Sequence, residues 1–293
     1  MQSDYPPIFY AAAAGQLDRI RELGPVSAPE DLNQALAEAC SLSQFEAADL
    51  LMEFGASADG LYHEAYGTVL FPACERLNPE GIRFLLKHGA DPARTVHRLD
   101  GPRDALTHLL HSPYRSPLKA QCIQTLLSAG VVPPDDAVTA IHRESLPLLR
   151  AALDRNPDAL HHPLHAAYGL YPLQGASLLH LAVEFNQPDL AGELLSRGLD
   201  INTTAEDIPG TAGTEPVWPT SLVALGKQTP LFHARGYSRD MLKFLLDRGA
   251  DPARKAPFLK NGKPVQLTVL ELFQAIDDIE CTLLEEILIL RSV

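Results

Sequence analysis

The six residues GADPAR occur twice in this chain, at 89–94 and at 249–254. Each copy follows a leucine-rich run, GIRFLLK in one case and DMLKFLLD in the other, whose apolar residues have helical spacing. Gly89 and Gly249 then stand where a helix commonly ends in a left-handed residue. The Asp-Pro pair that follows keeps the chain extended and prevents the helix from resuming. The same helix-and-stop phrase at two distant places indicates a repeat protein.

Other segments follow the same plan of a short helix, a tight turn, a second helix ending in paired leucines, and a glycine stop. The clearest is SLLHLAVEFNQPDLAGELLSRGLDIN. Neither helix of such a unit can bury its apolar face alone, so stacked units share one continuous core. The four clear copies lie at 177–202, 229–253, 68–93 and 135–160, and the weaker ones at 6–24, 34–58 and 104–130. A last helical pair at about 268–291 lacks the glycine stop and is expected to cap the array.

These units resemble the ankyrin repeat family, whose phrase TPLHLAA..GH..IV..LL..GADVN is matched here by SLLHLAV..NQ..LA..LL..GLDIN. TPL at 229–231 and HLA at 180–182 are further close matches. The resemblance covers nearly the whole chain and implies an all-α solenoid of stacked helix-turn-helix units with long, irregular finger loops. We expect one domain, 1–293, with repeats at about 6–33, 34–67, 68–103, 104–134, 135–176, 177–228 and 229–267 and a cap at 268–293.

Small residues stand where the family's inner helices approach each other, for example Ala39 with Cys40 and Ala73 with Cys74. Cys122 stands where the second helix of a repeat usually carries Ile. The four cysteines have no metal-type spacing, and we expect these three to be packing residues. His180 matches the histidine of the family phrase, which implies a structural hydrogen bond between adjacent links.

The chain departs from the family plan in several places. The segments 161–175 and 203–228 are much longer than a standard link, and the second carries the only tryptophan, Trp218. A further insertion, HSPYRSPLK at 111–119, falls between the two helices of one repeat. Long loops on a regular scaffold more often carry function than packing. The alternative is that these insertions are neutral surface segments.

The resemblance also implies which residues face the concave groove, namely the two that follow each small pair. From the third repeat onward these are charged, imidazole-bearing or aromatic, and aromatic and Arg side chains supply much of the energy at interfaces. For Phe185 and Trp218 a second reading stays open, in which each packs a finger onto its neighbour. The expected partner-binding residues are Arg76, His111, His142, Arg143, Phe185, Trp218 and Tyr237.

Composition limits the class of partner. The 293 residues carry 24 Lys and Arg against 37 Asp and Glu, a formal net charge of −13. Such a chain is poorly suited to bind nucleic acid or an anionic membrane through its overall field. No apolar run approaches the roughly 20 residues of a membrane helix, and the start lacks the basic region of a secretory signal. We therefore expect a cytoplasmic, monomeric protein that binds neither nucleic acid nor membrane.

The sequence holds little evidence for chemistry. No HExxH, GxSxG or CxxC motif is present, and GKQT at 226–229 lacks the first glycine and the preceding strand of a phosphate loop. His161, His162 and His165 lie close together, but Pro163 interrupts the helix that would align them, so we predict no metal site and no cofactor. An alternative is an enzyme or small-molecule binder with a pocket formed by His108, Tyr168 and Tyr171 beneath the long loops.

Taken together, these features favour a non-catalytic protein-protein interaction module over an enzyme, with a partner bound in the concave groove and against the enlarged fingers. A purely structural spacer is a weaker alternative, because a spacer does not need irregular links. We expect Leu194 and Leu195 to be buried, and Phe185 to tolerate alanine well if it faces the groove.

Overall fold

The computed structural model describes residues 5–63, 67–98, 101–112, 114, 116–164, 175–206, 222–234 and 239–275, and these residues are mostly helical. They fall into two compact units, Met1–Pro134 (unit 1) and Asp135–Val293 (unit 2), each of which is described by itself. The division lies at the boundary expected between the fourth and fifth repeats. Within the described ranges, every helix is too short or too polar to cross a membrane.

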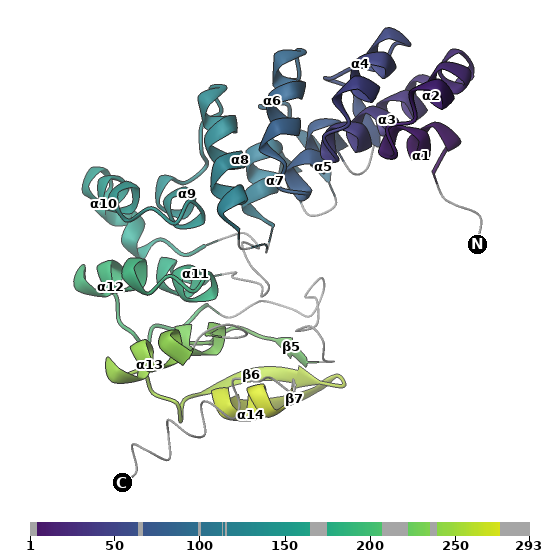
Figure 1. The fold of residues 1–293 in the computed structure, drawn as a ribbon. Coiled ribbons are helices and arrows are strands. Elements are labelled where there is room, and N and C mark those ends of the chain that lie inside the picture. The colour runs from purple at the N-terminus through teal and green to yellow at the C-terminus, as the bar shows by residue number, and fades with distance from the viewer. Residues whose placement is uncertain are drawn as a thin grey trace. The chain divides into compact units, whose positions relative to one another are not determined.

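Unit 1 is built from pairs of antiparallel helices whose members form an inner and an outer row (Figure 1). Each inner helix packs on the next inner helix, and outer helices pack likewise, as α2 does on α4 and α6 on α8. The inner helices are α1 (Pro7–Ala13), α3 (Pro29–Ser41), α5 (Leu70–Glu75) and α7 (Ala105–Leu110). The outer helices are α2 (Leu17–Leu23), followed by the 3-10 turn η1 (Gly24–Val26), α4 (Phe45–Glu53), α6 (Pro79–Lys87) and α8 (Pro117–Ser128).

Unit 2 continues the same plan in its own compact body. The inner elements α9, α11 and η3 pack in succession, and the outer helix α10 packs on α12. The inner elements are α9 (Asp136–His142), α11 (Leu178–Glu184) and the 3-10 turn η3 (Pro230–His233). The outer elements are α10 (Leu146–Arg155), followed by η2 (Pro157–His161), α12 (Pro188–Ser196) and α13 (Arg239–Asp247), and the last described helix is α14 (Val269–Ala275).

The expectation of an all-α fold needs a correction, because several links between repeats are β-hairpins. In unit 1, β1 (Leu61–His63) pairs with β2 (Gly67–Thr68), and β3 (Val96–Arg98) pairs with β4 (Gly101–Arg103). Unit 2 has a three-stranded antiparallel sheet in the order β5 (Leu222–Ala224), β6 (Lys255–Lys260), β7 (Lys263–Thr268). Pairing satisfies the backbone groups of links that leave the helices, which is why extended fingers become strands. The turn Asn261-Gly262 between β6 and β7 has positive φ at both residues, as a tight hairpin requires.

In four of the described helix pairs, the turn passes through one non-glycine residue with left-handed backbone. The residues after the inner helices include Ser43, Leu77, Glu144 and Asn186, with φ of 60°, 52°, 52° and 54°. The same positive φ recurs at the same position, in the turn after the inner helix, which shows that these units are structural repeats. At the ends of the outer helices, Gly89 and Gly249 have φ of 93° and 91°, which confirms their predicted role as left-handed stops.

The two GADPAR segments make the same contacts with the link that precedes each of them. In the first copy, the Asp91 backbone N–H donates to Asp59 Oδ1 at 3.0 Å, and the Arg94 guanidinium donates to the Asp59 carbonyl oxygen. In the second copy, the Asp251 N–H donates to Asn202 Oδ1 at 2.8 Å, and Arg254 donates to the Asn202 carbonyl oxygen. The repeated phrase therefore joins one finger to the next.

The turns between helices are also joined across repeats by a side-chain amide. Asn78 donates through Nδ2 to the carbonyl oxygens of Cys40 and Ser41, at 3.2 and 3.0 Å, near the end of α3. Gln187 donates through Nε2 to the Ile141 carbonyl oxygen at 2.8 Å, near the end of α9. Terminal helix carbonyls lack a partner within their own helix, so these amides supply one from the neighbouring repeat.

The core follows the inner helices, where the small pairs allow close approach. Cys40, Cys74 and Cys122 are free and buried, as expected of packing residues. Leu194 is fully buried as predicted, but Leu195 is only partly buried, so the inward face of α12 is narrower than the sequence indicated.

The two ends of the insertion at 111–119 are joined by a buried lysine. Lys119 is 1% exposed, and its Nζ donates to the Ser112 carbonyl oxygen at 2.5 Å. Removal from water lowers the pKa of Lys119 from 10.5 to about 7, because burial disfavours the charged form. The long, apolar part of the Lys119 side chain is thus packed in the interior at the base of the insertion.

Candidate functional site

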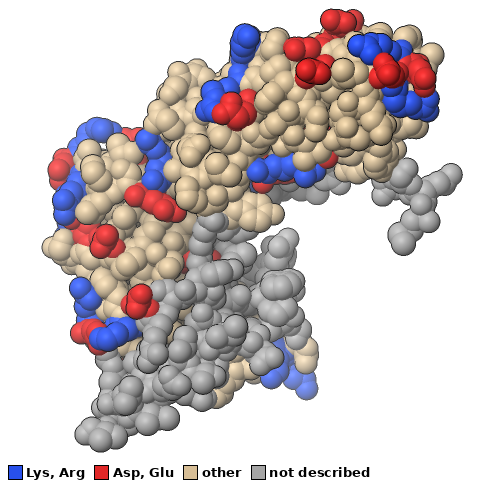
Figure 2. Space-filling view, in the orientation of Figure 1, with Lys and Arg blue, Asp and Glu red and all other residues tan. Residues whose placement is uncertain are grey.

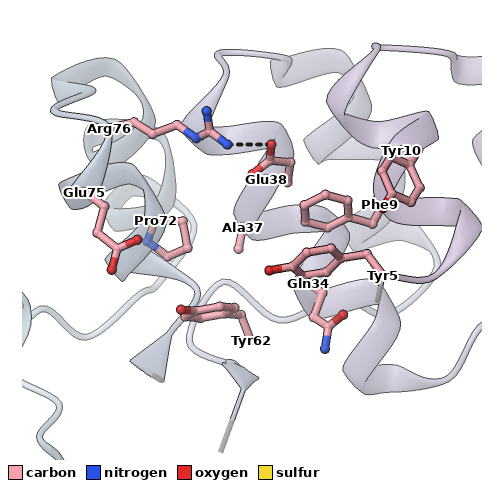
Figure 3. A pocket seen from close by; sticks show the side chains of 10 residues that line it. All are labelled: Tyr5, Phe9, Tyr10, Gln34, Ala37, Glu38, Tyr62, Pro72, Glu75 and Arg76. Carbon is pink, nitrogen blue, oxygen red and sulfur yellow. Dashed lines mark hydrogen bonds and ion pairs between the residues drawn. The ribbon is translucent and has the colours of Figure 1, made fainter. Parts of the chain in front are cut away.

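A pocket of about 380 Å³ opens on the inner side of unit 1, where α1, α3, α5 and the first finger meet (Figure 3). Its lining is unusually rich in aromatic side chains. Three of them precede or lie on α1, in the stretch YPPIFY, and the fourth lies on β1. The aromatic lining residues are Tyr5, Phe9, Tyr10 and Tyr62; the others are Gln34, Ala37, Glu38, Pro72, Glu75 and Arg76.

The aromatic rings form a continuous wall. Tyr5 and Phe9 are stacked with ring centroids 4.3 Å apart, and Tyr10 meets Phe9 edge-on at 5.5 Å. Tyr5 and Tyr10 nevertheless keep 47% and 46% of their surface exposed. Large aromatic side chains that are held in place but half exposed are typical of binding surfaces, because they offer area at a small cost in entropy. We refer to this site as the aromatic pocket.

The charged side chains of the aromatic pocket come from two neighbouring repeats. Arg76, directly after α5, donates through Nη2 to Glu38 Oε1 on α3 at 2.8 Å. The Glu38 side chain is 11% exposed and that of Arg76 is 49% exposed. In Figure 3, Glu75 points away from the Arg76–Glu38 pair, and its Oε1 lies 3.0 Å from His108 Nε2. The Arg76–Glu38 and Glu75–His108 pairs each connect successive inner helices, and they fix the side chains at the edge of the pocket.

The residues expected to face the groove occupy the ends of the inner helices. Arg76, Arg143 and Phe185 are the residues that cap α5, α9 and α11, and His111 caps α7. Arg76 is exposed, while Arg143 and His111 are half-buried. Their regular positions agree with the alignment of the repeats. Arg76 is the expected contact residue that lies in the aromatic pocket.

Phe185 and His142 are packing residues rather than an exposed contact surface, which corrects the expectation for both. Phe185 is 6% exposed and His142 is 2% exposed. Their rings meet edge-on with centroids 4.6 Å apart, and they belong to successive inner helices of unit 2. Of the two readings left open for Phe185, the structure therefore supports the packing one.

His108 and His233 also join repeats. His108 is 8% exposed and stacks on Phe71 with ring centroids 4.4 Å apart. His233 Nδ1 lies 3.2 Å from Glu184 Oε2, and both side chains are buried. Both imidazoles are therefore enclosed between neighbouring repeats. The described residues contain no cluster of three or more possible metal ligands, whereas His165 lies outside the described ranges.

His180 performs the structural role that the sequence predicted. Its Nδ1 accepts from the Ser177 backbone N–H at 3.1 Å, and its Nε2 donates to the Gln228 carbonyl oxygen at 3.0 Å. The ring thus closes the N-terminus of α11 and holds the link that leads into the next repeat. Burial, and to a smaller extent the neighbouring His233, lower the pKa of His180 from 6.5 to about 3.

We predict an acid-sensitive contribution from His180. Between pH 6.5 and about 3 the unfolded chain binds a proton that the folded chain does not, so stability falls as the pH falls through this window. Where the fall is steepest, the free energy of unfolding decreases by about 1.4 kcal/mol per pH unit. Urea unfolding of wild type and His180→Gln should show a stability difference that shrinks as the pH falls from 7 to 4. A difference that does not change with pH would contradict this assignment.

Four expected site residues lie outside the described residues, namely Tyr168, Tyr171, Trp218 and Tyr237. Their roles stay predictions. Sequence reasoning also missed residues, because it placed only small or apolar side chains in the groove of the first two repeats. The aromatic pocket uses residues one turn earlier on α1 and α3, and three aromatic rings within YPPIFY were the signal that could have located it.

Stacked pairs of short helices, inner row on inner row, joined by hairpin fingers, are the arrangement of an ankyrin repeat fold. No protein-family model matches the chain, and no curated protein matches it. Among solved structures the chain is similar to the human ASB11 ankyrin repeat domain, with 21% sequence identity over 96% of this chain and 97% of that chain and a TM-score of 0.41. At this identity and TM-score the likeness says nothing about a partner or a binding surface.

Proposed function

We propose that the chain is a non-catalytic protein-binding module whose partner contacts the inner side of unit 1 at the aromatic pocket. The observation that carries the proposal is the pair Tyr5 and Tyr10, which are fixed by stacking on or beside Phe9 and yet about half exposed. Such side chains are the usual anchors of protein interfaces. Arg76, already ordered by Glu38, extends the same surface with a polar edge.

The charges on the outer helices have a different role. On the outer helices of unit 1, Arg21 pairs with Asp18 on α2, and Arg83 pairs with Glu80 on α6. Figure 2 shows acidic and basic side chains interspersed over these helices. Interspersed and mutually paired charges keep a surface soluble without favouring one partner. This contrast supports the inner side, rather than the outer side, as the binding surface.

Affinity capture from native lysate tests the proposal. We expect a set of proteins to be captured by wild type and lost by the double variant Tyr5→Ala, Tyr10→Ala, because truncation of anchor residues typically costs more than 1 kcal/mol each. The matched control is Tyr114→Ala, which removes a tyrosine of unit 1 that is 58% exposed but lies outside the pocket. Circular dichroism and urea unfolding establish that the variants are folded. Identical capture by all three proteins would contradict the proposed surface.

A further inference from the structure

Four of the ten side chains that line the aromatic pocket are aromatic. The stacked pair Tyr5 and Phe9 lines one side, and Tyr62 from the finger lies below it in Figure 3. The face of an aromatic ring carries negative electrostatic potential and attracts a cation placed within about 6 Å of its centre. The wall therefore favours an occupant that is both apolar along its length and positively charged.

The ionised side chains of the pocket add to this preference. The lining holds two carboxylates, those of Glu38 and Glu75, and one guanidinium, that of Arg76, so it carries one net negative charge. Arg76 is directed to Glu38 at 2.8 Å, and Figure 3 shows Glu75 directed away from that pair. The Glu75 side chain is 50% exposed, so its carboxylate is accessible to a ligand. The whole chain has a formal net charge of −13, which attracts basic segments over longer distances.

The volume also restricts the occupant. Pockets for whole small molecules span about 300–1,000 Å³, and this one, at about 380 Å³, lies near the lower limit. It opens on the surface beside a finger, where an extended chain could lie across it. This space accommodates one long side chain of a partner, with the rest of the extended segment lying outside the pocket.

We propose that the aromatic pocket binds the cationic side chain of a lysine or arginine in an extended segment of the partner protein. The stem of the side chain packs on Tyr5 and Phe9, and its charged end lies near Glu75. This inference rests on the proposed function and adds the chemistry of the partner. Lysine and arginine share that chemistry, and the test below separates them.

The test uses capped pentapeptides of alanine whose central residue is lysine, arginine, norleucine or glutamate. Each is titrated into the isotope-labelled full chain, and amide shifts of residues around the pocket are followed by NMR. We expect the lysine or the arginine peptide to bind in the millimolar range and norleucine, of the same shape without charge, to bind about fivefold or more weakly. The glutamate peptide should bind more weakly than the cationic ones.

A pair of carboxylate variants locates the charge that matters. Glu75→Gln should weaken the binding of the cationic peptides about three- to tenfold and leave the affinity for the norleucine peptide unchanged. The matched control is Glu80→Gln, which removes an exposed carboxylate of α6 outside the pocket and should change neither affinity. The glutamine retains the oxygen that faces His108, so the variant keeps its hydrogen bond.

Three results would overturn the inference: norleucine bound as tightly as lysine, glutamate bound more tightly than either cation, or no shift near the pocket with any peptide up to about 20 mM. Each is distinguishable from failure of the proposed function. If lysate proteins are still lost by the Tyr5→Ala, Tyr10→Ala variant, the surface stands and only the preference for a cation is wrong.

Discussion

Replacing Phe185 by alanine is expected to lower the free energy of unfolding by about 3–5 kcal/mol, the range for a buried aromatic side chain. The ring is 6% exposed and meets the His142 ring edge-on at 4.6 Å, so its loss leaves a cavity between two successive inner helices of unit 2. Leu194→Ala, on the fully buried side of α12, should cost a similar amount, about 2–5 kcal/mol.

Urea unfolding followed by circular dichroism measures both losses. The control is Leu148→Ala on α10, where the side chain is 36% exposed and the expected change is below about 1 kcal/mol. A loss at Phe185 no larger than that at Leu148 would mean that the phenylalanine faces a groove after all. The packing account would then be wrong in unit 2.

Gly81→Ala is expected to destabilise the protein by about 2–3 kcal/mol, while the same change at Gly192 should stabilise it by about 0.5–1 kcal/mol. A Cβ at Gly81 would lie 2.3 Å from the backbone carbonyl oxygen of Cys40, so the first turn of α6 would have to move away from α3. At Gly192 the nearest atom is Phe244 Cζ at 3.8 Å, an ordinary contact.

The two glycines form a matched pair, because both lie within the outer helix of a repeat and both gain helix propensity from alanine. The difference in their unfolding free energies therefore isolates the steric term between neighbouring repeats. Midpoints of urea unfolding for the two variants and wild type provide the measurement. Equal, stabilising effects at both positions would contradict the close approach of α6 to α3.

Much of the fold could be predicted because the repeat places local signals at fixed positions. Gly89 and Gly249 are helix stops that any L side chain would strain, so their role is legible from sequence. The contacts of the GADPAR segments could not be predicted, because they involve residues of the neighbouring link. Asp59 and Asn202 stand four residues after their own glycine stops and become acceptors only when the repeats stack.

The candidate site was only partly predictable. Arg76 was found because it ends an inner helix and was expected to face the groove. The tyrosines of the aromatic pocket were missed because the groove positions of the first repeats hold small residues, and the pocket depends on how far α1, α3 and the finger stand apart. The burial of Phe185 was missed for the same kind of reason, since its exposure depends on the preceding repeat.

The strands in the fingers show a similar limit. In β6 and β7, KAPFLK and KPVQLT flank the turn Asn261-Gly262, which is a hairpin signal that reasoning from repeats alone passed over. The expected links were considered only for their length. Backbone pairing between β5 and β6 joins segments that are distant in the sequence, so no local pattern contains it.

The central claim is that a partner protein binds the inner side of unit 1, and amide hydrogen exchange tests it most directly. With a partner recovered by affinity capture, exchange is compared between the free and bound chain. The account predicts protection concentrated in the segments of Tyr5–Ala13, Gln34–Ser41 and Leu70–Arg76. Protection confined to the outer helices, or to unit 2, would contradict it.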